Sequence, residues 1–315
     1  MYDTLRPELL TASDDDRAIM ARDPTHVVSW DLFEHNSLPY LELRRPFILG
    51  LADGKWKPSL AHWFMRVLHD EGKLARVFTQ NIDGLDFKLG LPGDLVVPVH
   101  GSMGSVGCEF CGASASLAGF RDAVRAQIRN IYCDRGGGGS SGDGGGDAGP
   151  EVSTPIACAQ CGRCGVKPTT VLYGRSLPEA FFAASSAEQL AGTDLLITMG
   201  TSLTVHPAAS LPAAMPPTTM RAVINRERVG EGVGLSFSAA GAAVGTAEAA
   251  VATSTFASPG HTPPALLRDV FVGGDCDEAI LELASRLGWL DKLAALRDCM
   301  APSSMQLLDA KLQMR

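Results

Sequence analysis

Apolar side chains recur with helical spacing in the segment that starts at Ser59 and ends at Gly72. They fall at positions i, i+3, i+4, i+7 and i+8, which form one face of a helix: Leu60, Trp63, Phe64, Val67 and Leu68. Serine favours the N-cap position and glycine commonly follows the last helical turn. The segment is therefore predicted to be an amphipathic helix.

Several short apolar runs have the character of buried strands. They are continuous rather than alternating, as in strands that are covered on both faces of a parallel sheet: residues 74–78, 95–99, 195–199, 222–224 and 270–272. A second amphipathic helix follows the last run, with Ile280, Leu283, Ala284 and Leu287 on one face. Strands and helices in this order predict an α/β fold with a parallel sheet.

Small or polar residues follow each of these apolar runs. The endings are Thr79 to Asp83, His100-Gly101, Gly200-Thr201-Ser202, Asn225-Arg226-Glu227 and Gly273 to Cys276. Each one alone is more typical of an ordinary polar turn. Ligands of open parallel sheets bind beyond the carboxyl ends of the strands, so the whole set predicts one binding crevice. Histidine can accept a proton near neutral pH, which makes His100 a candidate general base.

Two Cys-x-x-Cys pairs lie just downstream of His100. Two such pairs can supply the four thiolates of a closed tetrahedral zinc site, whose role is structural because no position is left for water: Cys108, Cys111, Cys158 and Cys161. Cys164 is an alternative fourth ligand, since Cys161 and Cys164 also have this spacing. Glycine-rich residues 136–149 lie between the two pairs and are predicted to be flexible, as are residues 230–264.

Composition narrows the functional classes. The 315-residue chain is 45% hydrophobic, with a formal charge of −8 and a pI near 5.4, so a large electrostatic interaction with nucleic acid is not expected. The first residues contain no apolar signal-peptide core, and residues 233–256 are too polar for a bilayer span. These features predict an intracellular protein of the nucleus or cytoplasm, with reduced cysteines and no membrane partner.

The motifs together resemble the sirtuins, most closely their class I members. They occur in family order: TQNIDGLD (79–86), HGS (100–102), the two CxxC pairs, VKPTTVLYGRSLPE (166–179), DLLITMGTSLTVHP (194–207), INRE (224–227) and GGDCDEAI (273–280). The resemblance implies a Rossmann-like parallel sheet with an inserted small zinc-ribbon domain. The expected parts are a Rossmann-like NAD-binding part (1–101), the zinc-binding domain (102–166), the continued Rossmann-like part (167–290) and a C-terminal tail (291–315).

One family feature has no match in the chain. Sirtuins begin with a strand and a Gly-Ala-Gly-x-Ser cofactor loop, whereas Met1 to Leu5 resemble the stretch that follows that loop. We therefore expect the first strand, which lies in the middle of the sheet, and the loop to be missing from this chain.

The resemblance implies an NAD-dependent protein-lysine deacetylase or deacylase, which transfers the acyl group to ADP-ribose and releases nicotinamide. It makes His100 and Asn81 catalytic. The residues expected to bind NAD are Gln80, Asn81, Ile82, Asp83, His100, Gly200, Thr201, Ser202, Asn225, Arg226, Glu227 and Cys276.

The expected partner is an acylated-lysine protein or peptide. It would pair as an added strand with Val171, Leu172, Tyr173 and Gly174. Arg175 stands where the family usually has Glu, which predicts selection against the most basic peptides. The alternative is a catalytically impaired sirtuin-like binding module, because the cofactor loop is absent.

Overall fold

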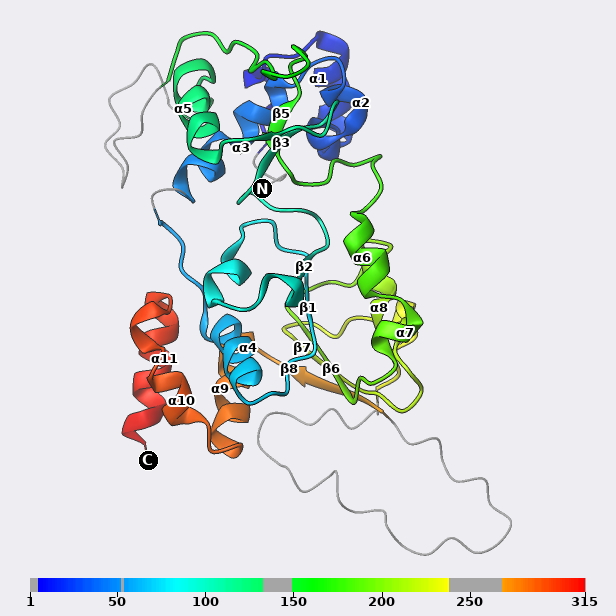
Figure 1. Ribbon diagram of the computed structural model, residues 1–315, viewed down its shortest axis with the longest axis vertical. Coiled ribbons are helices and arrows are strands. Elements are labelled where there is room, and N and C mark those ends of the chain that lie inside the picture. Colours follow the sequence, from blue (N-terminus) through cyan, green and yellow to red (C-terminus); the bar gives the residue numbers. More distant parts are fainter. Residues whose placement is uncertain (1–4, 52–53, 133–148, 238–267, 315) are drawn as a thin grey trace, which may run out of the picture. The chain divides into compact units, whose positions relative to one another are not determined.

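The computed structural model describes residues 5–51, 54–132, 149–237 and 268–314. The chain forms two compact units (Figure 1). Unit 1 comprises Met1–Trp56, Asn81–Gly84 and Pro98–Pro178, and unit 2 comprises Lys57–Gln80, Leu85–Val97 and Glu179–Arg315. The two predicted flexible insertions fall largely outside the described residues.

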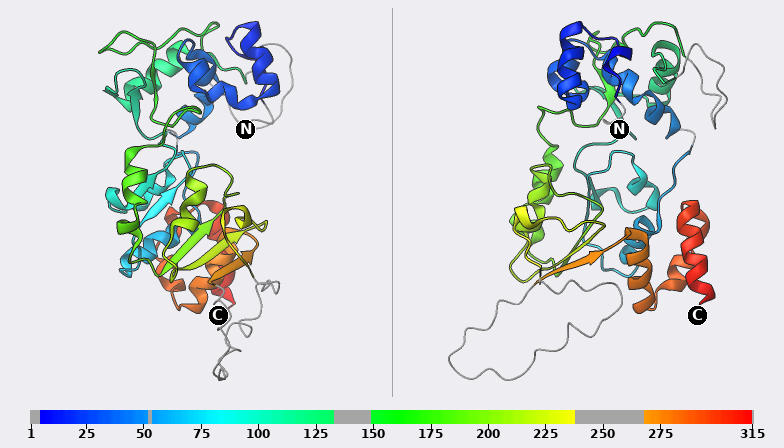
Figure 2. Two further views of the ribbon diagram at one scale, coloured as in Figure 1. Left: turned by 90° about the vertical axis from the view of Figure 1, so that its right-hand side faces the viewer. Right: turned by 180° about the vertical axis from the view of Figure 1, so that it is seen from behind.

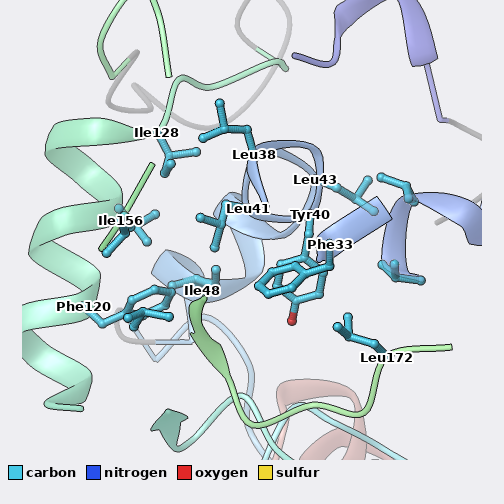
Figure 3. Close-up of a cluster of buried hydrophobic side chains, with 14 of the residues drawn as sticks. Phe33, Leu38, Tyr40, Leu41, Leu43, Ile48, Phe120, Ile128, Ile156 and Leu172 are labelled. Carbon is cyan, nitrogen blue, oxygen red and sulfur yellow. The ribbon is translucent and has the colours of Figure 1, made fainter. Parts of the chain in front are cut away.

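Unit 1 contains the helices α1 (Asp14–Arg22), α2 (Trp30–Phe33), α3 (Leu38–Gly50) and α5 (Leu117–Gln127). Helix α1 begins where the Ser13 side chain accepts a hydrogen bond from the Asp16 N–H, a typical N-cap. Apolar side chains of α2, α3 and α5 meet in one buried cluster, which also includes Leu172 (Figure 3). This core places the segment around Leu172 against the helices.

A small antiparallel sheet in unit 1 carries the cysteine pairs. Its strands are β3 (Val106–Cys108), β4 (Ser114–Ala115) and β5 (Val166–Pro168), in the order β4-β3-β5. Cys108 lies opposite Val166 in the register. The pairing of β3 with β5 therefore brings the first cysteine pair to the chain segment that follows the second pair.

A fully buried carboxylate ties the N-terminal segment to the cysteine-bearing part of unit 1. Glu42 accepts hydrogen bonds from the Thr11 N–H (2.8 Å) and hydroxyl (2.6 Å), the Ser153 hydroxyl (2.6 Å) and Arg129 Nε (3.0 Å). Residues before Trp56 consequently pack with the cysteine module. The sequence-based boundaries at residues 101, 166 and 290 follow the motifs and stay a prediction.

Unit 2 contains the parallel strands β6 (Leu195–Met199), β7 (Met220–Asn225) and β8 (Asp269–Gly273), which lie side by side (Figure 1). Strands β1 (Val77–Thr79) and β2 (Val96–Pro98) form a separate ladder. Strands β2, β6, β7 and β8 overlap the predicted runs, and the parallel pairing of β6, β7 and β8 is confirmed. Strand β1 begins later than predicted, at Val77 rather than at residue 74. Among the described residues of unit 2 the strands thus form two ladders, β1-β2 and β6-β7-β8.

Four helices of unit 2 share a second core: α4 (Leu60–Asp70), α9 (Cys276–Arg286), α10 (Leu290–Ala294) and α11 (Pro302–Gln313). Figure 2 shows the last three together at the C-terminal end of the chain, in orange to red. Helix α4 confirms the first predicted helix, with Ser59 as its N-cap. The expected C-terminal tail forms α10 and α11, whose Leu293 and Leu308 are fully buried.

The Asp277 carboxylate joins three of these helices. It accepts hydrogen bonds from the Leu60 N–H (3.2 Å), the Ala61 N–H (2.9 Å) and the Ser304 hydroxyl (2.5 Å). A side chain of α9 therefore satisfies the first N–H groups of α4 and fixes α11 beside them. The remaining helices of unit 2 are α6 (Glu179–Ala184), α7 (Ala187–Leu190) and α8 (Leu211–Ala214).

Candidate functional site

The two cysteine pairs form turns of the same design. The Gly112 N–H donates to the Cys108 carbonyl (2.9 Å), and the Gly162 N–H donates to the Cys158 carbonyl (2.9 Å). Both glycines adopt positive φ angles, 71° and 72°, which a side chain would strain. Each turn points both of its thiols to the same side, so two such turns can enclose one ion.

The four thiols meet in a single cluster. Their sulfur atoms all lie within 4.8 Å of one another, and the Cys108–Cys161 and Cys111–Cys158 sulfur pairs are 3.7 and 3.8 Å apart. A tetrahedral zinc ion with Zn–S bonds of about 2.3 Å separates its sulfur ligands by about 3.8 Å. The site therefore fits zinc. Cys164 is exposed and is not part of the cluster, so the geometry favours Cys161 as the fourth ligand.

The electrostatics of the cluster also fit a bound cation. Backbone N–H groups of Cys161 and Gln160 lower the pKa of the Cys158 thiol to about 7. An opposite balance holds at Cys111: the Ala113 N–H lowers its pKa, but burial and the neighbouring cysteines outweigh this and raise it to about 12. Four thiolates in such proximity need a positive ion between them, which a closed zinc site supplies.

His100 is fixed by the tight turn that follows it. Gly101 has a φ of 73°, and a Cβ atom there would lie 1.9 Å from the Thr169 carbonyl oxygen. Only glycine permits this close approach. The Val171 N–H then donates to the His100 carbonyl (2.9 Å). The predicted base therefore lies directly beside the predicted peptide-binding segment, within unit 1.

The polar turn after β1 also belongs mainly to unit 1. The Ile82 carbonyl accepts from the Met103 N–H (2.7 Å), and Ile82 packs against the core of this unit. Asn81 is exposed and Asp83 is half-buried. Unit 1 thus holds Asn81, Ile82 and Asp83 together with His100, whereas Gln80 belongs to unit 2.

The predicted peptide-binding segment is already paired along one edge. The Tyr173 N–H donates to the Val28 carbonyl (3.0 Å), and the Trp30 N–H donates to the Tyr173 carbonyl (2.8 Å), as in a parallel bridge. Leu172 is buried, and the Tyr173 side chain is 48% exposed. The segment therefore forms a single parallel bridge along one edge, and its Tyr173 side chain is about half exposed.

Unit 2 brings the ends of its three parallel strands together. The Gly200 N–H donates to the Ile224 carbonyl (3.1 Å), and the Gly274 N–H donates to the Asn225 carbonyl (3.1 Å). Cys276, the first residue of α9, donates its thiol hydrogen to the same Ile224 carbonyl (3.5 Å). The predicted residues that follow β6, β7 and β8 consequently share one edge of the sheet.

The loop after β6 has an unusual backbone. Leu203 has a φ of 53°, in the left-handed region that a leucine seldom adopts, and its N–H donates to the Thr201 hydroxyl (3.3 Å). Ser202 is exposed, and the Asn225 amide donates to the Glu227 carbonyl (2.9 Å). Hydroxyl and amide groups at this edge can bind the phosphates and riboses of a dinucleotide.

Comparison with known proteins decides the family. The Sir2 family model matches residues 14–207. The chain belongs to the Sir2 family. One Sir2 relative, the NAD-dependent protein deacetylase hst2-1 of Emericella nidulans, is 34% identical over 87% of this chain and 58% of its own length. Two others are 30% identical over 86% of the chain: SIR2rp1 of Leishmania major and sirtuin-2 of Danio rerio, matched over 76% and 60% of their lengths.

The chain thus spans 58% of the length of hst2-1. Within the part that the structure describes, none of the helices of this Sir2 family chain is long and apolar enough to cross a bilayer. Motif matching missed the buried Glu42 and an ion-pair cluster around Glu109, because their partners lie far away in sequence: Glu42 meets Arg129, and Glu109 meets Arg175.

Proposed function

We propose that this Sir2 family protein is an NAD-dependent protein-lysine deacetylase. The main support is that all three relatives named above are NAD-dependent protein deacetylases. The matches with them cover 86–87% of the chain. The catalytically impaired binding module is not favoured, because these relatives carry the names of enzymes. The substrate is an acylated-lysine protein or peptide.

His100 is proposed to be the general base. It takes a proton from a ribose hydroxyl, a role for which the histidine side chain is suited. Asn81 and Asp83 bind the nicotinamide and ribose end of NAD, with Gln80 on a ribose hydroxyl. Bound NAD supplies the ADP-ribose that accepts the acyl group, and nicotinamide leaves.

Unit 2 is proposed to bind the other end of the dinucleotide. Thr201 and Ser202 contact the phosphate and ribose region. Asn225 and Glu227 bind the adenosine ribose, while the backbone of Cys276 contacts adenine. The shared strand edge supports this assignment, since the residues after β6 and β7 are joined there by backbone hydrogen bonds.

The zinc site is proposed to be structural and closed. Its four thiolates fill the tetrahedral shell, so the ion stabilises the small antiparallel sheet and takes no part in the acyl transfer. The acyl peptide adds as a strand along Val171 to Gly174, a mode in which main-chain bonds provide the affinity. We further propose an intracellular location, in the nucleus or cytoplasm, where thiols stay reduced.

Nicotinamide release tests the proposal. The purified chain is incubated with NAD and an acetyl-lysine peptide, and nicotinamide is measured by chromatography. We expect His100→Ala to lower the rate by roughly 10²–10⁴-fold, the usual contribution of a general base. His69→Ala is the matched control, because His69 lies in the last turn of α4, where its ring contacts the neighbouring Asp70. Equal rates for His100→Ala and the wild type would contradict the assignment.

A further inference from the structure

A cluster of charges lies directly behind the predicted peptide-binding segment. The Lys167 side chain is only 1% exposed, and its ammonium lies 2.9 Å from one carboxylate oxygen of Glu109. The other oxygen of Glu109 accepts from Arg175 Nε at 3.2 Å. Lys167 precedes the segment and Arg175 follows it, so one carboxylate contacts a residue on each side of Val171 to Gly174.

The Lys167 side chain also bonds to the backbone just before the segment. Its ammonium donates to the carbonyls of Pro168 (3.1 Å) and Thr170 (2.5 Å). A buried ammonium requires a counter-ion and full hydrogen bonding, and Glu109 is the carboxylate that completes this set. The chain immediately before Val171 is therefore held through Glu109.

The Arg175 side chain is held by two contacts. The Arg175 guanidinium lies 4.5 Å from the centre of the Trp30 ring, in addition to its bond with Glu109. Trp30 is the residue whose backbone pairs with Tyr173, and its ring packs edge-on against Phe110, with ring centres 5.7 Å apart. The exit of the segment is thus anchored to the same short stretch of chain, Glu109-Phe110.

Glu109 itself lies on a rigid support. It is located between two members of the first cysteine pair, and its N–H donates to the Gly165 carbonyl (2.9 Å). The carboxylate is mostly buried, with an 18% exposed side chain. A carboxylate fixed in this way can set the position of a mobile partner rather than follow it.

We propose that Glu109 is a positioning residue for the acyl peptide. It holds the entry of segment 171–174 through Lys167 and the exit through Arg175, so that the segment is already in place when the peptide binds. The inference rests on the proposed function for the identity of the bound peptide. The resemblance to the Sir2 family does not by itself predict this role of Glu109. Its partner Arg175 stands where the family usually has a glutamate.

Two readouts on the full chain separate the positioning from the function. Hydrogen–deuterium exchange at the amides of Val171 and Tyr173, without any ligand, reports whether the segment is held. Fluorescence anisotropy with a labelled acetyl-lysine peptide reports whether the held segment binds its partner. Zinc content is measured in parallel to show that the cysteine cluster is intact in each variant.

Glu109→Gln should raise both exchange rates and the peptide Kd by roughly tenfold, while one zinc per chain is retained, because two charge-assisted hydrogen bonds are weakened. Arg175→Gln removes only the half-exposed Arg175 contact and should raise the Kd of an acetyl-lysine peptide without basic residues by roughly threefold. Asp122→Asn is the control. It removes an exposed ion pair with Arg125 on α5, and both readouts should stay at wild-type values.

Should Glu109→Gln fail to fold, the double change Glu109→Leu with Lys167→Met removes the buried charges together and should fold with faster exchange in the segment. Wild-type exchange in every folded variant overturns the positioning role. Faster exchange with an unchanged peptide Kd overturns its link to the peptide. A wild-type chain that does not bind the peptide counts against the proposed function, while the exchange data still decide the role of Glu109.

Discussion

Replacing Cys161 by serine should empty the zinc site, whereas replacing Cys164 should leave it filled. Both cysteines are exposed, and both stand in a Cys-x-x-Cys spacing, so the sequence alone does not distinguish them. In the structure the Cys161 sulfur lies 3.7 Å from the Cys108 sulfur, the separation that two ligands of one tetrahedral zinc ion have. Cys164 lies outside the group of four thiols.

The size of the effect follows from the number of ligands. A structural zinc site contributes an apparent free energy of about 10–16 kcal/mol at neutral pH, so one thiolate of four accounts for roughly 3 kcal/mol or more. That loss weakens zinc binding by about two orders of magnitude. It is also a large part of the 5–15 kcal/mol by which a typical domain is stable.

Metal analysis after dialysis against a chelator measures the effect directly. The wild-type chain and Cys164→Ser should each retain one zinc per chain, and Cys161→Ser should retain far less and unfold at a lower temperature. Zinc retained by Cys161→Ser and lost from Cys164→Ser would refute the assignment of the fourth ligand.

Three further predictions concern the stability of the fold and the turn after His100. Glu42→Ala should lower the free energy of unfolding by about 3–5 kcal/mol, measured by urea denaturation, because it leaves the partly buried Arg129 without its carboxylate; Glu8→Ala, an exposed carboxylate, should change it little. Gly101→Ala should abolish nicotinamide release without stripping zinc, since a Cβ there collides with the Thr169 carbonyl; activity near the wild-type level would contradict the tight turn. Burial opposes ionisation of Asp269, but Arg221 and the Ser236 N–H outweigh it and hold the pKa of Asp269 below its usual value. A lowered folded-state pKa stabilises the protein above about pH 4, and this contribution is lost as the pH falls further. In acid unfolding monitored by circular dichroism, the wild type should therefore lose more stability between pH 4 and pH 2 than Asp269→Asn; equal losses would contradict the role of Asp269.

Features with a local cause were predictable from the sequence. Helix α4 followed from the spacing of its apolar residues and from Ser59, and strand β6 coincides with the predicted run at residues 195–199. The cysteine cluster was predictable because two residues between thiols place both on one metal. The helix and the strand depend on residues that are close together along the chain, and the cluster joins two distant pairs that are each a recognisable metal-binding motif.

Features that join distant segments without a recognisable motif were not predictable. Glu42 meets Arg129 and Glu109 meets Arg175, and neither acidic residue stands in a motif that signals its partner. The helices before residue 51 also have no strong periodic pattern of their own. Their cohesion comes from the buried cluster around α3 and from the hydrogen bonds to Glu42, which exist only after the chain has folded.

The measurement that tests the central claim most directly is mass spectrometry of the reaction products. The chain is incubated with NAD and an acetyl-lysine peptide, and the deacetylated peptide, nicotinamide and acetyl-ADP-ribose are quantified together. The account predicts all three in equal amounts, with the rate of their formation roughly 10²–10⁴-fold lower in His100→Ala. Deacetylated peptide with free acetate in a reaction without NAD, or peptide that remains acetylated while the zinc site is full, would contradict it.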